Sequence, residues 1–247
     1  MQGNGGFSRV DLLVTVVIAA GLVYLVFAMD GCRARSRRLQ NGTQVRGIQQ
    51  GLATYPSGSG SYYPGVNPNR IPIGPRAASP KQYGFAAPSD SDQSASFAIM
   101  LTNQYFTPQF AISPKESVKA VRPVGPVENS ITITQNHYSY SLLQYAGPNN
   151  AGRREEWGCT ENSRAPAVAD RSKAIDPALT TTSLHTRTMD FDSTHWQGNI
   201  AWNDNHVTFE STGVFPARWM IIGTARLETE DDLFIASGED DAKMAYR

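Results

Sequence analysis

The first 54 residues separate sharply into an apolar part and a polar part. Residues 12–29 carry no charge, and Val, Leu, Ile and Ala make up most of them. As a helix that rises about 1.5 Å per residue, this run spans about 27 Å, close to the ~30 Å hydrocarbon core of a bilayer. The pattern therefore predicts a membrane-spanning helix near the N-terminus.

The polar part, residues 32–54, keeps a helical pattern. Val45, Ile48 and Leu52 fall on one helical face, and Leu39 extends the same stripe. Such a stripe favours packing against the chain's own globular part. We therefore expect residues 32–54 to form a helical stem.

Three glycines interrupt this stem: Gly42, Gly47 and Gly51. Each of them costs a helix about 1 kcal/mol relative to alanine. We therefore expect a stem that is less rigid than a continuous helix, with a break near Asn41 and Gly42.

Beyond residue 54 the periodicity predicts one more helix and several strands. Sequence rich in Pro, Ser and Gly predicts irregular loop up to about residue 88, and residues 93–105 then repeat apolar positions at helical spacing. Alternating or short apolar runs predict strands at residues 130–134, 137–145, 165–169, 199–202, 206–210 and 219–222. This order of elements indicates an α+β fold class, with a long N-terminal helix and stem packed on a mainly antiparallel sheet.

The clearest hairpin signal lies near the C-terminus. Asn203, Asp204 and Asn205 separate two alternating runs. Asn and Asp tolerate the left-handed backbone that tight turns require, so we expect Asn205 to hold a positive φ. The same pattern places Trp202 in the core.

The residues just before the apolar run stand in an unusual order. Gly6 is followed by Phe7, a polar pair, Val10 and Asp11. This order resembles the N-terminal signature of type IV prepilins and type II secretion pseudopilins. The resemblance implies that a prepilin peptidase cuts between Gly6 and Phe7 and methylates the new N-terminus. It also implies that Asp11 pairs with the N-terminal ammonium of a neighbouring subunit, which would offset the cost of a carboxylate at bilayer depth.

On this resemblance the chain divides into four parts with a pilin-like arrangement. Residues 1–6 are a leader peptide, residues 7–31 the transmembrane helix, and residues 32–54 the stem. Residues 55–247 are an extracytoplasmic α+β head.

Other interpretations of the same segment stay open. Residues 26–28 suit signal peptidase cleavage, and Cys32 stands where a lipoprotein signal places its cysteine, although Asp30 fits that signal poorly. Asp11 as an interfacial residue would interact favourably with the helix dipole. The basic residues 33–38 follow the span, and the positive-inside rule would keep that side in the cytoplasm. The resemblance implies the opposite orientation, with the head outside.

A second resemblance lies in the C-terminal hairpin and rests on His195, Gly198, Asn199, Asp204, Asn205 and His206. These residues resemble the hairpin of prepilin-type, processing-associated proteins named for a His-spacer-Asp-Gly motif, a pilin-like group of planctomycete-type bacteria. Here the spacer is one residue shorter, and Asn205 replaces the glycine. Residues 162–171 resemble a recurring segment of the same group.

His195, Asp204 and His206 are of the types that bind zinc. However, Asp204 and His206 are expected on alternate faces of the turn, which makes a shared metal awkward. We interpret His195 as hydrogen-bonded to the hairpin and Asp204 as closing its own turn, and we expect no metal and no cofactor. Acidic residues between 228 and 241 have calcium-type oxygens but no EF-hand spacing, so a solvated acidic tail is favoured.

Composition narrows the function further. Lys plus Arg and Asp plus Glu both number 22, so no overall charge favours nucleic acid as a partner. Cys32 and Cys159 lack metal-ligand spacing, and a disulfide between them stays open. No nucleophile elbow, P-loop, dinucleotide fingerprint or metalloprotease helix is present, so we expect no enzyme. The tyrosines of the run 138–145 are expected on a sheet face rather than on a sugar-binding platform.

These patterns together favour a structural subunit. It would sit in the inner membrane as a single-pass protein with its head in the periplasm or extracytoplasmic space. Its partners would be the prepilin peptidase and other pilin-like or pseudopilin subunits, assembled into a pilus or a type II secretion pseudopilus. The alternative is a membrane-tethered module that binds glycan, calcium or protein.

Overall fold

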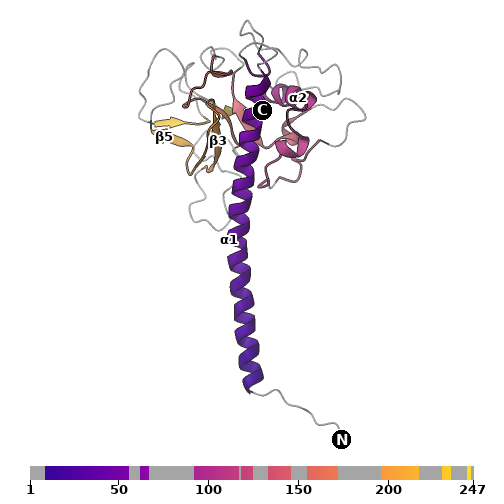
Figure 1. Ribbon diagram of the computed structural model, residues 1–247, viewed down its shortest axis with the longest axis vertical. Coiled ribbons are helices and arrows are strands. Elements are labelled where there is room, and N and C mark those ends of the chain that lie inside the picture. The colour runs from indigo at the N-terminus through magenta and orange to yellow at the C-terminus, as the bar shows by residue number, and fades with distance from the viewer. Residues whose placement is uncertain are drawn as a thin grey trace. The chain divides into compact units, whose positions relative to one another are not determined.

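The computed structural model describes residues 9–55, 62–66, 92–116, 118–124, 133–145, 155–171, 196–216, 230–234 and 244–245. The chain separates into two compact units, Met1–Gln40 and Asn41–Arg247, here called the anchor unit and the globular unit. One helix, α1 (Arg9–Thr54), supplies its first part to the anchor unit and its last part to the globular unit (Figure 1). The boundary at Asn41 lies inside the predicted stem.

The globular unit combines short helices with an antiparallel sheet. Its helical elements are α2 (Asp92–Thr102), η2 (Pro108–Ala111) and η3 (Gln135–His137). Its strands are β1 (Tyr140–Leu143), β2 (Pro166–Asp170), β3 (Gly198–Trp202), β4 (Val207–Glu210), β5 (Val214–Pro216), β6 (Glu230–Asp232) and β7 (Met244–Ala245).

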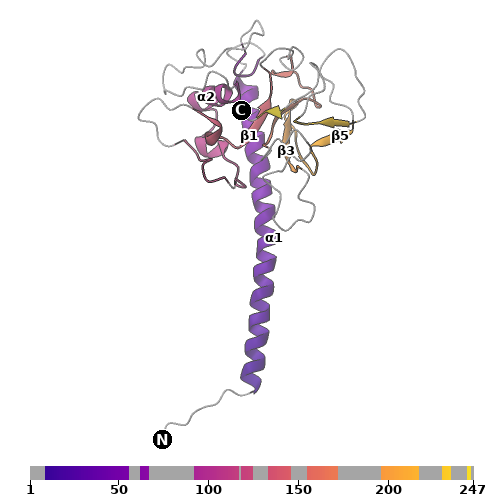
Figure 2. The ribbon, with the colours of Figure 1, turned by 180° about the vertical axis from the view of Figure 1, so that it is seen from behind.

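Five of these strands form one sheet in the order β4-β3-β2-β1-β7, and all neighbours in it are antiparallel. Strands β5 and β6 form a separate antiparallel pair. In both views the last part of α1 has α2 on one side and the sheet on the other (Figures 1 and 2). The predicted α+β layout is therefore confirmed.

The last part of α1 is a core element of the globular unit. Val45, Ile48 and Leu52 are 0–1% exposed and belong to the same apolar cluster as Phe97 of α2 and Ile200 of β3. The predicted stripe is confirmed at these three positions.

The extension of the stripe to Leu39 is wrong, because that side chain is 74% exposed. Among the α1 residues whose burial the structure describes, the first buried one is Asn41, two positions further along the chain. Leu39 therefore belongs to the exposed part of the helix.

The predicted break near Asn41 and Gly42 is also wrong, because α1 is continuous from Arg9 to Thr54. The glycines serve close packing instead. A Cβ at Gly47 would stand 2.4 Å from Cε1 of Phe110, and one at Gly51 would stand 2.8 Å from Cε of Met100. Burial of the helix outweighs the weak local preference of glycine against helix.

Helix α2 begins at the predicted place but ends three residues before the predicted end at Tyr105. Gln104 adopts a left-handed backbone with φ 57°. The amide of Tyr105 donates to the carbonyl of Met100, and that of Gln104 donates to Leu101. This pair of bonds is a Schellman motif, which satisfies the last carbonyls and stops the helix.

The structure confirms some of the predicted strands and not others. Strand β2 and the hairpin β3–β4 are confirmed within a residue or two. Of the predicted strand 137–145, only Tyr140–Leu143 is a strand, because residues 135–137 form η3. Residues 133–134 are not strand, and residues 130–132 and 219–222 lie outside the described residues.

The turn η3 is fixed by local side-chain bonds. Thr134 accepts a hydrogen bond from the amide of Asn136, and Nδ1 of His137 accepts one from the amide of Thr134 at 3.0 Å. These bonds offer the backbone an alternative to a sheet ladder, which the alternation of apolar residues does not reveal.

Candidate functional site

The first part of α1 presents its apolar side chains to the outside. Among the described residues it is the one helix long and apolar enough to cross a membrane, and its most apolar stretch is not buried. The large apolar side chains from Val10 to Met29 are 45–77% exposed. A surface of this kind requires an apolar environment such as lipid or other helices.

Asp11 lies in the first turn of α1. There its negative charge interacts favourably with the N-terminal end of the helix dipole. The hydroxyl of Thr15 donates to the carbonyl of Asp11 at 2.7 Å. Gly6 and Phe7 lie outside the described residues.

A buried carboxylate joins α1 to the sheet. Asp170, at the end of β2, is 0% exposed and accepts hydrogen bonds from Nδ2 of Asn41 at 2.7 and 2.8 Å. It also accepts from the backbone amide and the side-chain amide of Asn199 at 2.7 and 3.2 Å. One acidic side chain thus connects α1, β2 and β3.

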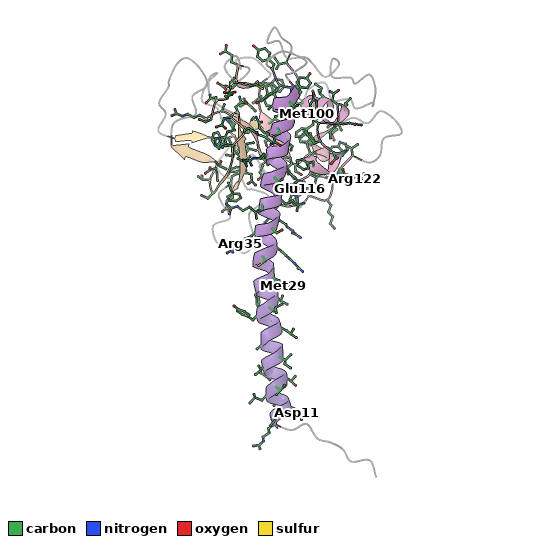
Figure 3. The ribbon with its side chains drawn as sticks, viewed as in Figure 1. Asp11, Met29, Arg35, Met100, Glu116 and Arg122 are labelled. Carbon is green, nitrogen blue, oxygen red and sulfur yellow. The ribbon has the colours of Figure 1, made fainter. Side chains whose placement is uncertain are left out.

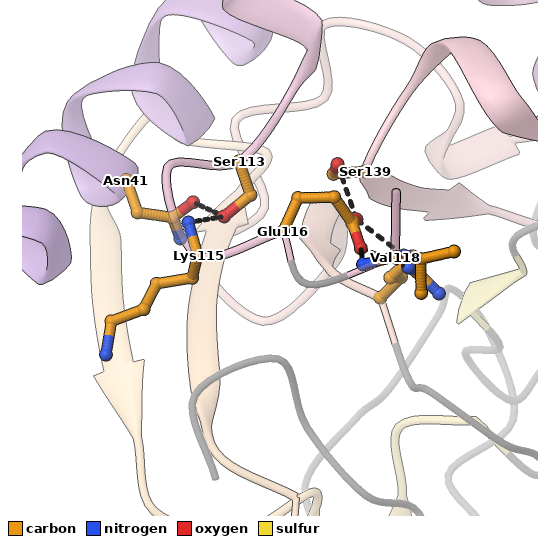
Figure 4. A network of polar contacts seen from close by, with 7 residues as sticks. Asn41, Ser113, Lys115, Glu116, Val118 and Ser139 are labelled. Atoms are coloured by element: carbon orange, nitrogen blue, oxygen red, sulfur yellow. Dashed lines mark hydrogen bonds and ion pairs between the residues drawn. The ribbon is translucent and has the colours of Figure 1, made fainter. Parts of the chain in front are cut away.

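Asn41 is bonded on its other side as well. Its Oδ1 accepts from the hydroxyl of Ser113 at 2.7 Å (Figure 4). It also accepts from the hydroxyl of Tyr140 at 3.1 Å. We call this network the Asn41 junction; its members are Asn41, Ser113, Tyr140, Asp170 and Asn199. Burial, and then the nearby Asp170 carboxylate, raise the pKa of Tyr140 well above its ordinary value, so its hydroxyl stays a donor.

An ion pair lies next to the Asn41 junction. Arg171 follows Asp170 in the chain and donates to both carboxylate oxygens of Glu116, at 2.6 and 3.1 Å. Their side chains are 6% and 4% exposed. The hydroxyl of Ser139 and the amide of Val118 also donate to Glu116 (Figure 4). Because the carboxylate is so fully bonded, the charge is well compensated despite its burial.

The hairpin residues divide into two groups. Gly198 and Asn199 face the Asn41 junction: a Cβ at Gly198 would stand 2.8 Å from Cβ of Asp170, so only glycine fits there. Asn199 is 4% exposed, and its backbone amide donates a hydrogen bond to the buried carboxylate of Asp170. His195 lies outside the described residues.

The second group forms the turn. Asn205 has φ 68°, as predicted, and its amide donates to the carbonyl of Trp202 at 2.9 Å. Asp204 accepts from the amide of His206, so it closes its own turn as predicted.

The prediction that Asp204 and His206 point to alternate faces is wrong, because Nδ1 of His206 contacts the carboxylate of Asp204. The imidazole also stacks on Trp202, with ring centroids 5.4 Å apart and planes at 5°. Stacking brings the imidazole back over the turn. Side chains of both groups of hairpin residues thus contact other residues of the chain.

A second buried cluster lies around Tyr63. Its hydroxyl accepts from Gln49 of α1 at 3.0 Å and donates to Asn203 at 2.5 Å. Asn203 in turn donates to the carbonyl of Glu156 and to Thr160. Burial is the main cause that raises the pKa of Tyr63 above its ordinary value, so this hydroxyl too stays protonated.

The described residues show no group of three or more His, Cys, Asp or Glu side chains that would hold a metal ion. Cys32 and Cys159 are both exposed free thiols. Of the acidic C-terminal stretch, residues 230–232 are the strand β6, so this part is not the tail that the composition favoured. Tyr138, Tyr140 and Tyr145 are at most 1% exposed and belong to the core, and of the three only Tyr140 lies in a strand, β1.

The Asn41 junction does not follow from the sequence pattern. That pattern predicts a helix break near Asn41 and the end of a strand at Asp170. A signal was present, since an acid directly follows the apolar run 165–169 and such a strand is buried on both faces. What the sequence does not contain is the pairing of Asp170 with residues 41 and 199.

No protein-family model, no curated protein and no solved structure matches this chain.

Proposed function

We propose that the chain is a membrane-anchored, pilin-like structural subunit. A prepilin peptidase would cut it between Gly6 and Phe7, and the product would assemble with similar subunits into a pilus or a type II secretion pseudopilus. Its globular unit would lie in the periplasm or extracytoplasmic space. Asp11 would pair with the N-terminal ammonium of a neighbouring subunit.

One observation carries this proposal: α1 is a single helix with two environments. Its first part exposes an apolar surface, and its last part is buried among α2 and the sheet. A helix of 46 residues is about 69 Å long at about 1.5 Å per residue, so it is more than twice as long as the ~30 Å core of a membrane. This continuity favours a subunit over a module on a flexible tether, because the anchor and the globular unit share one backbone element.

Mass spectrometry of the N-terminus, on chain purified from native membranes, tests the proposal. We expect a mature chain that starts at N-methylated Phe7, and we expect Gly6→Ala to block or strongly slow the cut. Val10→Ala, which leaves the Gly6-Phe7 pair intact, is the matched control and should be processed normally. An intact Met1 in cells with active prepilin peptidase, or a lipidated Cys32, would contradict the proposal.

A further inference from the structure

A cluster of arginines follows the apolar part of α1 directly. The first of them lies four residues beyond Met29, about 6 Å along the helix, and the last lies about 7.5 Å further. All four are exposed, and Arg35 projects outward from the helix beyond Met29 (Figure 3). We call them the arginine collar; its members are Arg33, Arg35, Arg37 and Arg38.

The collar surrounds much of the helix. At about 100° per residue, its side chains point in directions that cover about 200° of the circumference. Asp30 precedes it, but no further acidic residue occurs before Asp90, so the segment is net positive. Because the positive charge is spread around the helix, anionic groups can bind to it from several sides.

The depth of the collar matches the headgroup layer of a bilayer. That layer adds roughly 5–7 Å to each side of the hydrocarbon core. With Met29 at the core boundary, the guanidinium groups lie in this layer or reach back to it along their apolar stems. Tyr24 and Phe27, which are 77% and 72% exposed, lie in the half of the span that is next to the collar.

We propose that the arginine collar binds the phosphate groups of anionic phospholipids and thereby fixes the depth of α1 in the membrane. Guanidinium groups bind phosphate with two parallel hydrogen bonds, and an anionic leaflet attracts basic residues next to a span. The binding surface is continuous with the apolar part of α1, so lipid is already adjacent to it. The proposal rests on the membrane anchor of the proposed function, but not on leader cleavage or assembly.

The test uses the full chain in micelles that contain equal amounts of phosphatidylglycerol and phosphatidylcholine. Native mass spectrometry counts the lipids that stay bound. We expect the wild type to retain phosphatidylglycerol preferentially. Replacing all four collar arginines by glutamine should reduce that preference about tenfold or more, because each basic residue contributes to the attraction. Replacing them by lysine, which keeps the charge, should preserve most of it.

A matched variant removes four exposed charges elsewhere: Arg46→Gln, Lys119→Gln, Arg122→Gln and Arg164→Gln. It should retain lipid like the wild type. Equal retention by the collar variant and the wild type would overturn the proposal. Equal loss in the matched variant, or displacement of the lipid by duplex DNA at the same phosphate concentration, would overturn it as well. The N-terminal mass of the same samples reports processing separately, so failure of the two proposals is distinguishable.

Discussion

Asp170 is the residue at which α1, β2 and β3 meet. Its carboxylate accepts two hydrogen bonds from Asn41 and two from Asn199, and none of the three side chains is more than 4% exposed. Hydrogen bonds to charged groups contribute about 1.5–3 kcal/mol each, and donors left unpaired in a core add a desolvation penalty. The loss of Asp170 is therefore expected to have a large effect on stability.

We expect Asp170→Ala to lower the free energy of unfolding by about 3–5 kcal/mol. Tryptophan fluorescence during urea unfolding in detergent measures this, because residues 1–54 contain no tryptophan and the signal comes from the globular unit. Glu161→Gln, at an exposed acid, is the control and should change stability by less than about 0.5 kcal/mol. If Asp170→Ala lowers the free energy of unfolding no more than Glu161→Gln does, the Asn41 junction contributes little to stability.

His137 makes the globular unit sensitive to acid. Burial first, and then the charge of Arg122, lower the pKa of His137 below its ordinary value of 6.5. Its Nδ1 must be unprotonated to accept from the amide of Thr134. Below about pH 6.5 the unfolded chain binds a proton at His137 more readily than the folded chain does. The contribution of neutral His137 to the free energy of unfolding is therefore complete above that pH, and it is lost as the pH falls through the pKa of the folded chain.

We expect the melting temperature to fall more for the wild type than for His137→Asn between about pH 7.5 and about pH 5.5. Asparagine keeps an acceptor at this position and does not titrate, so the difference between the two proteins isolates the imidazole. Parallel pH profiles would mean that His137 does not couple folding to acid.

At the scale of elements, the glycines of α1 determine how closely other elements approach the helix. Gly47→Ala would improve helix propensity by about 1 kcal/mol but would push Cβ to 2.4 Å from Phe110. Overpacking of this kind costs about 1–3 kcal/mol, so we expect net destabilisation by urea unfolding. Gly31→Ala is the control: no atom lies within 4 Å of its Cβ, so stability should be unchanged or higher. Equal effects of the two substitutions would contradict close packing.

Elements with strong local signals were predictable from sequence. The apolar run and the stripe at Val45, Ile48 and Leu52 identify α1, and Asn203-Asp204-Asn205 identifies the hairpin. In each case the deciding physics is local: hydropathy, periodicity, or the tolerance of asparagine for positive φ.

Elements decided by tertiary contacts were not predictable in the same way. Gly42 and Gly47 weaken a helix locally, and only the elements packed on them explain why α1 continues. Thr134 and His137 convert an alternating run into η3 through side-chain bonds that the alternation does not encode. The Asn41 junction combines residues far apart in sequence, so a single sequence without pairing information cannot reveal it.

At the scale of the whole molecule, the proposed pairing of Asp11 predicts different effects on membrane insertion and on assembly. Asp11→Ala makes the span more apolar, so insertion should be unchanged. If the chain assembles as proposed, incorporation into filaments should fall, because the ammonium of the neighbouring subunit would lose its counter-charge. Asp204→Ala removes an exposed acid from the hairpin turn and should leave incorporation unchanged. Quantifying mutant and wild type in assembled filaments tests this, and equal incorporation would reject the pairing role.

The shared backbone of α1 also has a mechanical consequence. Val45, Ile48 and Leu52 lie in the core of the globular unit, so the helix is not a tether attached to a finished domain. Pulling α1 out of the globular unit would break these apolar contacts and the hydrogen bonds that Asn41 makes with Asp170, Ser113 and Tyr140. We therefore expect removal of the helix to unfold the globular unit. A protease that cuts just after Thr54 would likewise release a domain without its central helix.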